Sequence, residues 1–147
     1  MRWFLDSSAL VKRYVREPGS SWLRTELARN ELLIAQITPV ELIAAICKRY
    51  RAGDISRFTF YQSRYHLLQD FKAQAYKVIA LNDRIIKAAQ DLTCAQNLRA
   101  YDAVQLATAF YAINALKSPR FIFITADARL EAAAIAEGLQ TDNPLNH

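Results

Sequence analysis

Four short apolar runs stand out along the chain, and their hydrophobic residues follow one another almost without interruption instead of alternating with polar ones. They cover Trp3–Leu5, Leu32–Ala35, Lys77–Leu81 and Phe121–Thr125. Continuous runs of this length are typical of β-strands that are buried on both faces, as in a parallel sheet. A further stretch, Leu139–Thr141, is a candidate for a fifth strand at the edge of that sheet.

Helical patterns separate the apolar runs. The clearest extends from Pro39 to Ala52, where hydrophobic residues recur at nearly helical spacing and Gly53 follows as a stop signal. Similar patterns cover residues 57–73, 83–96, 102–116 and 128–137. Because strands alternate with helices, we predict an α/β fold with a mostly parallel sheet of four to five strands and helices on both faces.

The 147 residues contain no repeat, low-complexity segment or linker, so we predict a single domain over residues 1–147. Within it, Glu17–Ser20 has the composition of a turn, and the tail Asp142–His147 is predicted to be a loose end. Cys47 and Cys94 lie in apolar helical patterns without a C-x-x-C motif, which indicates two buried thiols in a reducing compartment.

Charge and hydropathy bear on partners and location. Lys and Arg total 19 against 14 acids, and the resulting net charge of +5 fits a polyanionic partner such as nucleic acid. Asp6 interrupts the first apolar run, which is therefore not the core of a signal peptide. No run approaches the roughly 18 apolar residues that span a membrane. The sequence thus predicts a cytoplasmic protein that does not enter a membrane.

Four acidic residues fall at related places on this map. Asp6 and Asp127 follow the first and fourth apolar runs, Glu41 comes shortly after the second, and Asp102 opens a long helical pattern. The carboxyl ends of parallel strands share one edge of a sheet, and ligands bind there in the crevice where the strand order reverses. We therefore expect the four acids to converge at that edge.

Helix capping is the competing interpretation of these acids. Thr38–Glu41 has the pattern of a capping box, with Thr at the N-cap, Pro at the first position and Glu at the third. Asp6, Asp102 and Asp127 can each cap a helix or lie in its first turn, where an acid is stabilised by roughly 0.3–1 kcal/mol. Capping alone does not explain why Asp6 and Asp127 follow buried strands.

A metal site explains the apolar setting better. Carboxylates crowded in a partly desolvated cleft repel one another and raise one another's pKa, and a divalent cation removes that conflict. A set of oxygen ligands without a convincing His or Cys favours Mg²⁺ or Mn²⁺ over Zn²⁺. Such a site is suited to metal-assisted hydrolysis of a phosphodiester bond.

The chain resembles the PIN-domain ribonucleases, and most closely the VapC-type toxins of prokaryotic toxin–antitoxin pairs. Four stretches carry the resemblance, in the order D-S-S-A-L, T-P-V-E-L, L-R-A-Y-D-A-V-Q-L-A and F-I-T-A-D-A-R-L. It implies a PIN-like three-layer sandwich and an endoribonuclease that depends on Mg²⁺ or Mn²⁺ and acts on single-stranded RNA. It also implies a cognate antitoxin and a homodimer as assemblies.

Site residues carry over onto this sequence position by position. The resemblance implies that the metal and catalytic residues are Asp6, Glu41, Asp102 and Asp127, with Ser8 and Thr125 as supporting hydrogen-bonding residues. We expect the three aspartates to coordinate Mg²⁺, directly or through water. Glu41 either completes the shell or orients the attacking water, and hydrolysis then needs no covalent intermediate.

Basic residues near the expected site are candidates for RNA contacts, because phosphate contacts come mainly from Lys and Arg. The candidates are Lys12, Arg13, Arg16 and Arg99. The cluster Lys48–Arg51 is favoured as a solvated helix end, with RNA contact as the alternative. The aromatic series from Phe58 to Phe71 is favoured as core, and part of it is a candidate dimer or antitoxin surface.

Two other functional classes stay open. The chain is either a PIN-like nuclease that processes RNA outside a toxin–antitoxin pair, or a PIN-like domain that binds nucleic acid without catalysis. Haloacid-dehalogenase-like phosphatases are disfavoured because Ser8 occupies the place of their second Asp. Phosphate-binding glycine loops are excluded, because Gly19, Gly53 and Gly138 are isolated.

Overall fold

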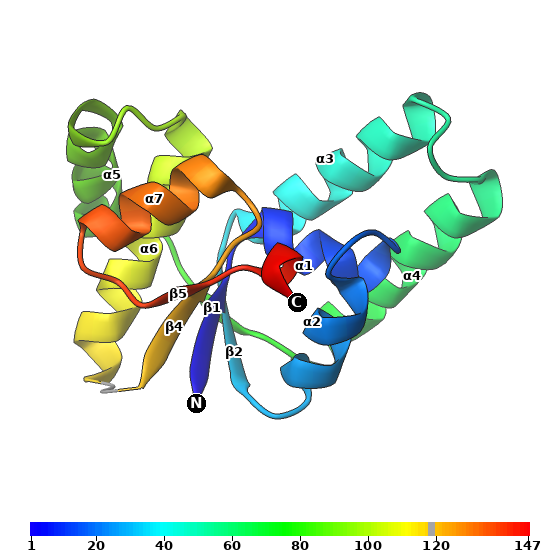
Figure 1. The fold of residues 1–147 in the computed structure, drawn as a ribbon, viewed down its shortest axis with the longest axis horizontal. Helices are drawn as coiled ribbons and strands as arrows, with labels where there is room; N and C mark the ends of the chain where they lie inside the picture. The colour runs from blue at the N-terminus through cyan, green and yellow to red at the C-terminus, as the bar shows by residue number, and fades with distance from the viewer. Residues whose placement is uncertain (118–119) are drawn as a thin grey trace.

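A computed structural model describes residues 1–117 and 120–147 and contains a five-stranded parallel sheet of order β3-β2-β1-β4-β5 (Figure 1). The strands are β1 (Arg2–Leu5), β2 (Glu31–Ala35), β3 (Lys77–Ile79), β4 (Phe121–Ile124) and β5 (Thr141–Asp142). Leu5 of the central strand is in register with Ile124 of β4. The predicted parallel sheet is confirmed, with its fifth strand at Thr141–Asp142 instead of Leu139–Thr141.

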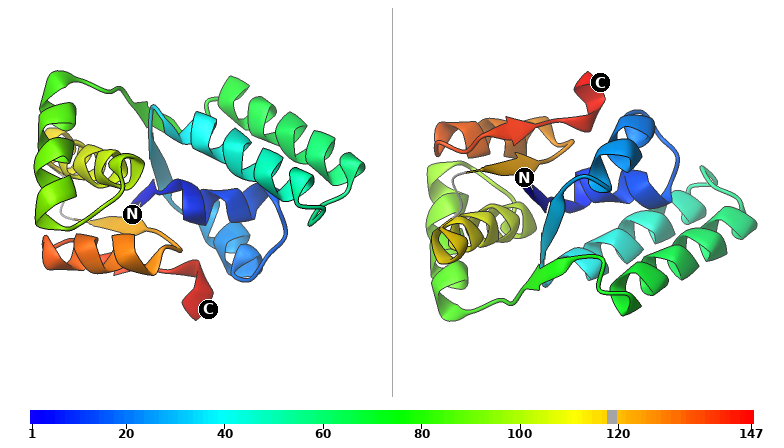
Figure 2. Two further views of the ribbon diagram at one scale, coloured as in Figure 1. Left: turned by 90° about the horizontal axis from the view of Figure 1, so that it is seen from above. Right: turned by 90° about the horizontal axis from the view of Figure 1, so that it is seen from below.

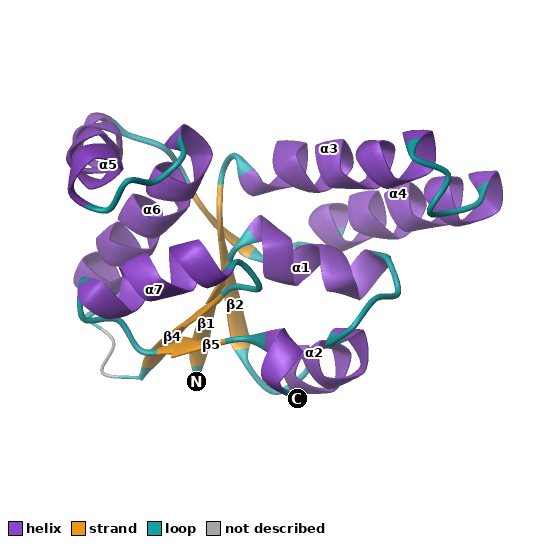
Figure 3. Ribbon diagram, turned by 45° about the horizontal axis from the view of Figure 1, so that its top comes forward, coloured by secondary structure: helices purple, strands orange, loops and turns teal. Residues whose placement is uncertain are grey.

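Seven α-helices and one short 3₁₀ helix are found in the described residues. They are α1 (Ser7–Tyr14), α2 (Ser20–Leu27), α3 (Thr38–Arg51), α4 (Arg57–Lys72), α5 (Asp83–Ala95), α6 (Ala100–Leu116), α7 (Ala128–Ala136) and η1 (Pro144–Asn146). Helices α5, α6 and α7 cover one face of the sheet, and α1 to α4 lie on the other, as Figure 3 shows. The three-layer α/β sandwich is therefore confirmed.

The central strand explains why the apolar runs are continuous. Phe4 is fully buried in the core under α5–α7, where its ring stacks on Phe123 with centroids 5.8 Å apart. Its neighbours Trp3 and Leu5 point to the opposite face and join the core under α1–α4. Successive side chains of a strand face opposite sides, so a strand covered on both sides must be apolar at every position.

Helices α3 and α4 form a hairpin that extends away from the sheet (Figure 2). Phe60 and Leu67 of α4 are buried against the rest of the protein, whereas Phe58, Tyr61 and Tyr65 are more than half exposed. The prediction that this aromatic series is mainly core is therefore wrong for those three residues. They form an apolar stripe along α4, as the alternative of a surface for a partner requires.

One helix was not predicted, and two further expectations need correction. The turn predicted at Glu17–Ser20 is present, with Gly19 at φ +84°, but it leads into α2 over residues 20–27, for which no helix was predicted. The tail is not loose, because Asn143 is buried and His147 stacks on Trp22 with ring centroids 4.0 Å apart. Cys94 is exposed, so it is not the buried thiol that its apolar neighbours suggested.

No helix within residues 1–117 or 120–147 combines the length and the apolar character that crossing a bilayer requires.

Candidate active site

Asp6 and Asp127 lie on either side of the point where the strand order reverses. Asp6 follows β1, and its backbone N–H donates to the carbonyl of Ile124 at the end of β4 over 3.0 Å. The chain continues from β1 to β2 on one side, while β4 lies on the other, which is the crevice where open α/β sheets bind ligands. The two acids that follow neighbouring strands are thus brought together at this edge.

Asp6 is almost completely buried and is held by hydroxyl groups. Its Oδ2 accepts hydrogen bonds from the Ser8 backbone N–H at 3.1 Å, from the Ser8 hydroxyl at 2.5 Å and from the Thr125 hydroxyl at 3.1 Å. The first of these is an N-cap contact for α1. Burial raises the pKa of Asp6 above its usual range, although the hydrogen bonds from Ser8 and Thr125 oppose the rise.

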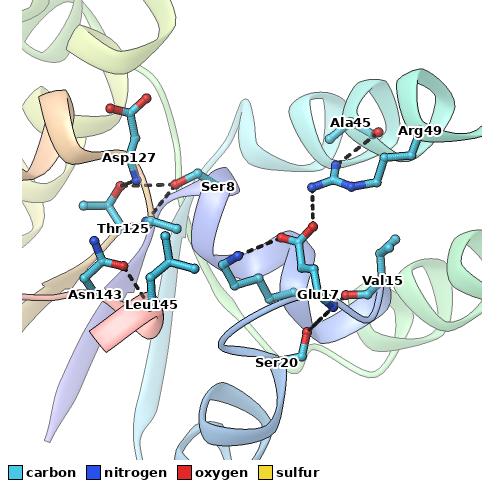
Figure 4. A network of polar contacts seen from close by, with 12 residues as sticks. Ser8, Val15, Glu17, Ser20, Ala45, Arg49, Thr125, Asp127, Asn143 and Leu145 are labelled. Carbon is cyan, nitrogen blue, oxygen red and sulfur yellow. Dashed lines mark hydrogen bonds and ion pairs between the residues drawn. The ribbon is translucent and has the colours of Figure 1, made fainter. Parts of the chain in front are cut away.

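Ser8 and Thr125 also connect the two loops that carry the acids (Figure 4). Their hydroxyl oxygens are 3.2 Å apart, the backbone N–H of Ala126 donates to Ser8 Oγ at 2.9 Å, and that of Asp127 donates to Thr125 Oγ1 at 3.1 Å. Asp127 in turn caps α7, because its Oδ1 accepts from the backbone N–H groups of Arg129 and Leu130. Asp6 and Asp127 therefore both cap helices, as the capping interpretation predicted, and both lie at the predicted sheet edge.

Glu41 does not form the predicted capping box. Helix α3 begins at Thr38, after an N-cap at Ile37, so Thr38 lies inside the helix and cannot act as its cap. The Thr38 hydroxyl instead accepts a hydrogen bond from Gln105 Nε2 at 3.0 Å, and the same nitrogen donates to Glu41 Oε2. The Glu41 carboxylate is thereby turned toward α6 and the other acids.

Gln105 is a residue that sequence analysis missed. It lies one helical turn after Asp102, on the same face of α6, and is completely buried. Its Nε2 has two partners, while its Oε1 has none within the described residues. The signal available in the sequence was an amide between apolar residues of α6, one helical turn after Asp102.

Asp102 lies in the first turn of α6 and completes the group. Burial, followed by the charges of Asp6 and Asp127, raises its pKa to about 6, against the opposing charges of Arg99 and Arg129. Burial also raises the pKa of Glu41 to about 7, with further contributions from Asp6 and Asp102 and an opposing hydrogen bond from Gln105. Carboxylates from four different elements therefore interact electrostatically at one edge of the sheet.

A family model described as PIN domain matches residues 3–136. The chain belongs to the PIN domain family. No curated protein matches the sequence. Among solved structures, the crystal structure of PAE2754 from Pyrobaculum aerophilum has a TM-score of 0.64 and 20% identity over 96% of this chain and 89% of that one.

Two further solved structures resemble this PIN domain to a similar degree. A toxin–antitoxin complex from Klebsiella pneumoniae has a TM-score of 0.64 and 17% identity, and covers 98% of both chains. VapBC2 from Rickettsia felis, bound to a DNA fragment from its promoter, has a TM-score of 0.63 and 16% identity over 97% of this chain and 98% of that one. At these identities the similarity establishes the fold.

The acids of this PIN domain match a hard divalent cation in the chemistry of their donors. All four supply carboxylate oxygens, and a cation relieves both the burial of charge and the repulsion between acids that raise the pKa of Glu41 and Asp102. As the side chains stand, no group of three or more His, Cys, Asp or Glu within residues 1–117 and 120–147 has an arrangement that could hold a metal ion. Coordination by the three aspartates therefore requires rotation of their side chains.

The basic residues predicted to meet RNA are placed differently from one another. Lys12 is buried, and its Nζ pairs with Glu17 at 2.8 Å. Arg13 pairs with Asp70 at 2.7 Å, beside the hydroxyl of Tyr14. Both cations are therefore paired with carboxylates of the protein itself. Arg99 is exposed and lies near Asp102, because its charge partly opposes the rise in the pKa of that residue.

Proposed function

We propose that this PIN domain is an endoribonuclease that uses Mg²⁺ or Mn²⁺ to hydrolyse RNA phosphodiester bonds, and that it is the toxin of a toxin–antitoxin pair. One observation carries the nuclease proposal. Four acids interact electrostatically at one sheet edge: the charges of Asp6 and Asp102 add to the burial that raises the pKa of Glu41, and the charges of Asp6 and Asp127 add to the burial that raises the pKa of Asp102. Acids whose pKa is raised by burial and by neighbouring acids are typical of functional sites.

The chain's own residues divide the work in this proposal. Asp6, Asp102 and Asp127 would hold the ion, which when bound polarises the phosphate and stabilises the leaving oxygen. Gln105 Nε2 engages Glu41 Oε2 and holds the carboxylate, which would orient a water and accept its proton. A pKa of about 7 suits a group that accepts a proton near neutral pH. Hydrolysis is direct, without a covalent intermediate.

The toxin role is supported by the fold and by one surface. Similar folds occur in the toxin–antitoxin complex from Klebsiella pneumoniae and in VapBC2. The exposed stripe of Phe58, Tyr61 and Tyr65 on α4 is an apolar surface of the kind that protein partners cover. We therefore propose a cognate antitoxin, a homodimer and a cytoplasmic location, where RNA is available.

The nuclease proposal is tested by incubating a labelled pool of single-stranded RNA with Mn²⁺, with EDTA, and with Mn²⁺ plus the Asp102→Asn variant. We expect cleavage with Mn²⁺ alone. Equal cleavage in all three reactions identifies a contaminating nuclease and removes the support for this site. The toxin role predicts a short reading frame upstream of the gene, and it is tested by expressing the chain with and without that frame. Growth arrest that this frame does not relieve contradicts it, and then RNA processing outside a toxin–antitoxin pair is favoured.

A second candidate function is a PIN domain that binds nucleic acid without catalysis. It is favoured by the finding that the described acids are not arranged to hold a metal ion. Calorimetric titration with Mn²⁺ separates the two candidates, because a catalytic centre must bind the ion and Asp6→Asn must weaken that binding. Binding of RNA without binding of Mn²⁺ is the result expected for the second candidate.

A further inference from the structure

A hollow of about 500 Å³ lies against the acids, and the proposed function gives it no role. It is bounded by α1, by α3, by the residue before α6 and by the loop between β4 and α7. Four cations line it, and we call it the basic hollow: Lys12, Lys48, Arg49 and Arg99. No carboxylate is among its lining residues.

The basic hollow is continuous with the candidate active site. Ser7 and Ser8 line it, and Ser8 is the residue that bonds to the buried Asp6. Arg99 forms the N-cap of α6, three residues before Asp102. An RNA strand that places one phosphate at the acids would therefore place its neighbouring nucleotide in the hollow.

Glu17 reduces the positive charge of this hollow by pairing with two of its four cations. Its Oε1 pairs with Lys12 Nζ at 2.8 Å and its Oε2 pairs with Arg49 Nη2 at 2.5 Å, as Figure 4 shows for Arg49. One carboxylate thus partly neutralises two cations and fixes α1 against α3. Lys48 and Arg99 are exposed, and no ion pair to either is found in the described part of the chain.

We infer that the basic hollow binds the phosphate of the nucleotide that adjoins the cleaved bond, with Lys48 and Arg99 as its contacts. Glu17 lowers the affinity for that phosphate, because it neutralises part of the positive charge of Lys12 and Arg49. The inference rests on the proposed function, since RNA is the polyanion that the neighbouring acids would cleave. Phosphate contacts of this kind come mainly from Lys and Arg and position a strand without reading its sequence.

The test measures binding without cleavage. The full chain, kept in EDTA, is titrated against a fluorescein-labelled pool of single-stranded RNA 12-mers, and anisotropy gives Kd between 50 and 200 mM KCl. We expect Lys48→Ala and Arg99→Ala each to weaken binding roughly threefold or more, and to reduce the slope of log Kd against log salt by about 0.7, the value for one phosphate contact on a single strand. Lys87→Ala, an exposed lysine of α5, is the matched control and should bind like wild type.

Glu17→Gln gives a result of the opposite sign. Removing the shared counter-charge should tighten RNA binding and steepen the salt slope, which loss of a merely structural ion pair does not do. Circular dichroism checks that this variant is folded, because Lys12 is buried beside the altered group. The Lys48 and Arg99 variants decide the inference whatever the stability of Glu17→Gln.

The outcomes separate the hollow from the nuclease. If Lys48→Ala and Arg99→Ala bind RNA like wild type, or lose no more than Lys87→Ala, the inference is overturned even when the protein cleaves RNA with Mn²⁺. If both lose affinity and slope while no cleavage is seen, the hollow is supported and the nuclease proposal fails. If they keep RNA binding but lose binding of a labelled poly-glutamate peptide, the hollow serves an acidic protein, which also overturns the inference.

Discussion

Raising the pH should destabilise this PIN domain in the absence of divalent cations. Glu41 and Asp102 have folded-state pKa values of about 7 and about 6, above the ordinary values of 4.5 and 3.8. Between the ordinary and the raised value, the folded protein binds more protons than the unfolded chain, so the free energy of unfolding falls as pH increases. The loss begins near pH 4 and is complete above about pH 7.

The size of this loss follows from the same values. One pKa unit corresponds to about 1.4 kcal/mol, so Glu41 and Asp102 taken separately give roughly 3 kcal/mol each. Asp102 is itself one cause of the raised pKa of Glu41, so the two are not additive, and solvent screens both half-buried groups. We expect a net decrease of about 2–4 kcal/mol between pH 5 and pH 7.5. Asp70 does not obscure it, because its lowered pKa affects stability only at more acidic pH.

Urea unfolding followed by circular dichroism at pH 5, 6 and 7.5, in EDTA, measures the effect. The double variant Glu41→Gln/Asp102→Asn is the control and should show a smaller pH dependence than the wild type, because of the three acids with a raised pKa only Asp6 remains. Saturating Mn²⁺ should stabilise the wild type more at pH 7.5 than at pH 5, because the ion binds deprotonated carboxylates. A wild-type protein that becomes more stable from pH 5 to pH 7.5, or a double variant with the same slope, refutes the reasoning.

Three further predictions concern single positions. Asp6→Asn should remove cleavage that depends on Mn²⁺ but change the free energy of unfolding by less than about 1 kcal/mol, because the amide oxygen can still accept the N-cap hydrogen bond. A thermal melt and the RNA assay measure the two effects. A variant that unfolds, but whose folded fraction has normal activity, contradicts the prediction. Gln105→Leu should lower the rate of Mn²⁺-dependent RNA cleavage roughly ten- to a hundredfold by releasing Glu41, measured as an initial rate at saturating Mn²⁺, and an unchanged rate sinks the idea. Gly19→Ala should cost about 2–4 kcal/mol in urea unfolding, because its Cβ would lie 2.5 Å from a carbonyl oxygen of the C-terminal segment, whereas Gly53→Ala, with similar φ and open space, should cost about 1 kcal/mol; equal losses would show that the close contact does not matter.

The sheet was predictable because burial on both faces leaves a local mark in the sequence. Apolar runs identified four strands, and the acids that follow them were expected at one edge from parallel topology alone. Helix α2 left no such mark, because only Ser20, Leu23 and Leu27 of its eight residues are buried. The fifth strand is only two residues long and depends on pairing with β4. The ordered tail depends on the stacking of His147 on Trp22, which lies far away in the sequence.

Partners of polar side chains were the least predictable part of the site. Lys12 and Arg13 look like free cations in the sequence, but Glu17 and Asp70 engage them after folding. Asp70 is 57 residues from Arg13, so no local pattern reveals the pair. In the same way, Gln105 reaches Glu41 across 64 positions, and that contact decides how the carboxylate is turned.

The strand order has a consequence for how the protein is made. The central strand β1 pairs with β2 some thirty residues later, but its other partner, β4, begins only at Phe121. A ribosome therefore synthesises residues 1–124 before Thr125 and Asp127 can join Asp6, and contacts of such long sequence separation form slowly. Fragments from translation that stops before Asp127 lack part of the acid set, so the activity proposed for this protein would arise only after that residue has been synthesised.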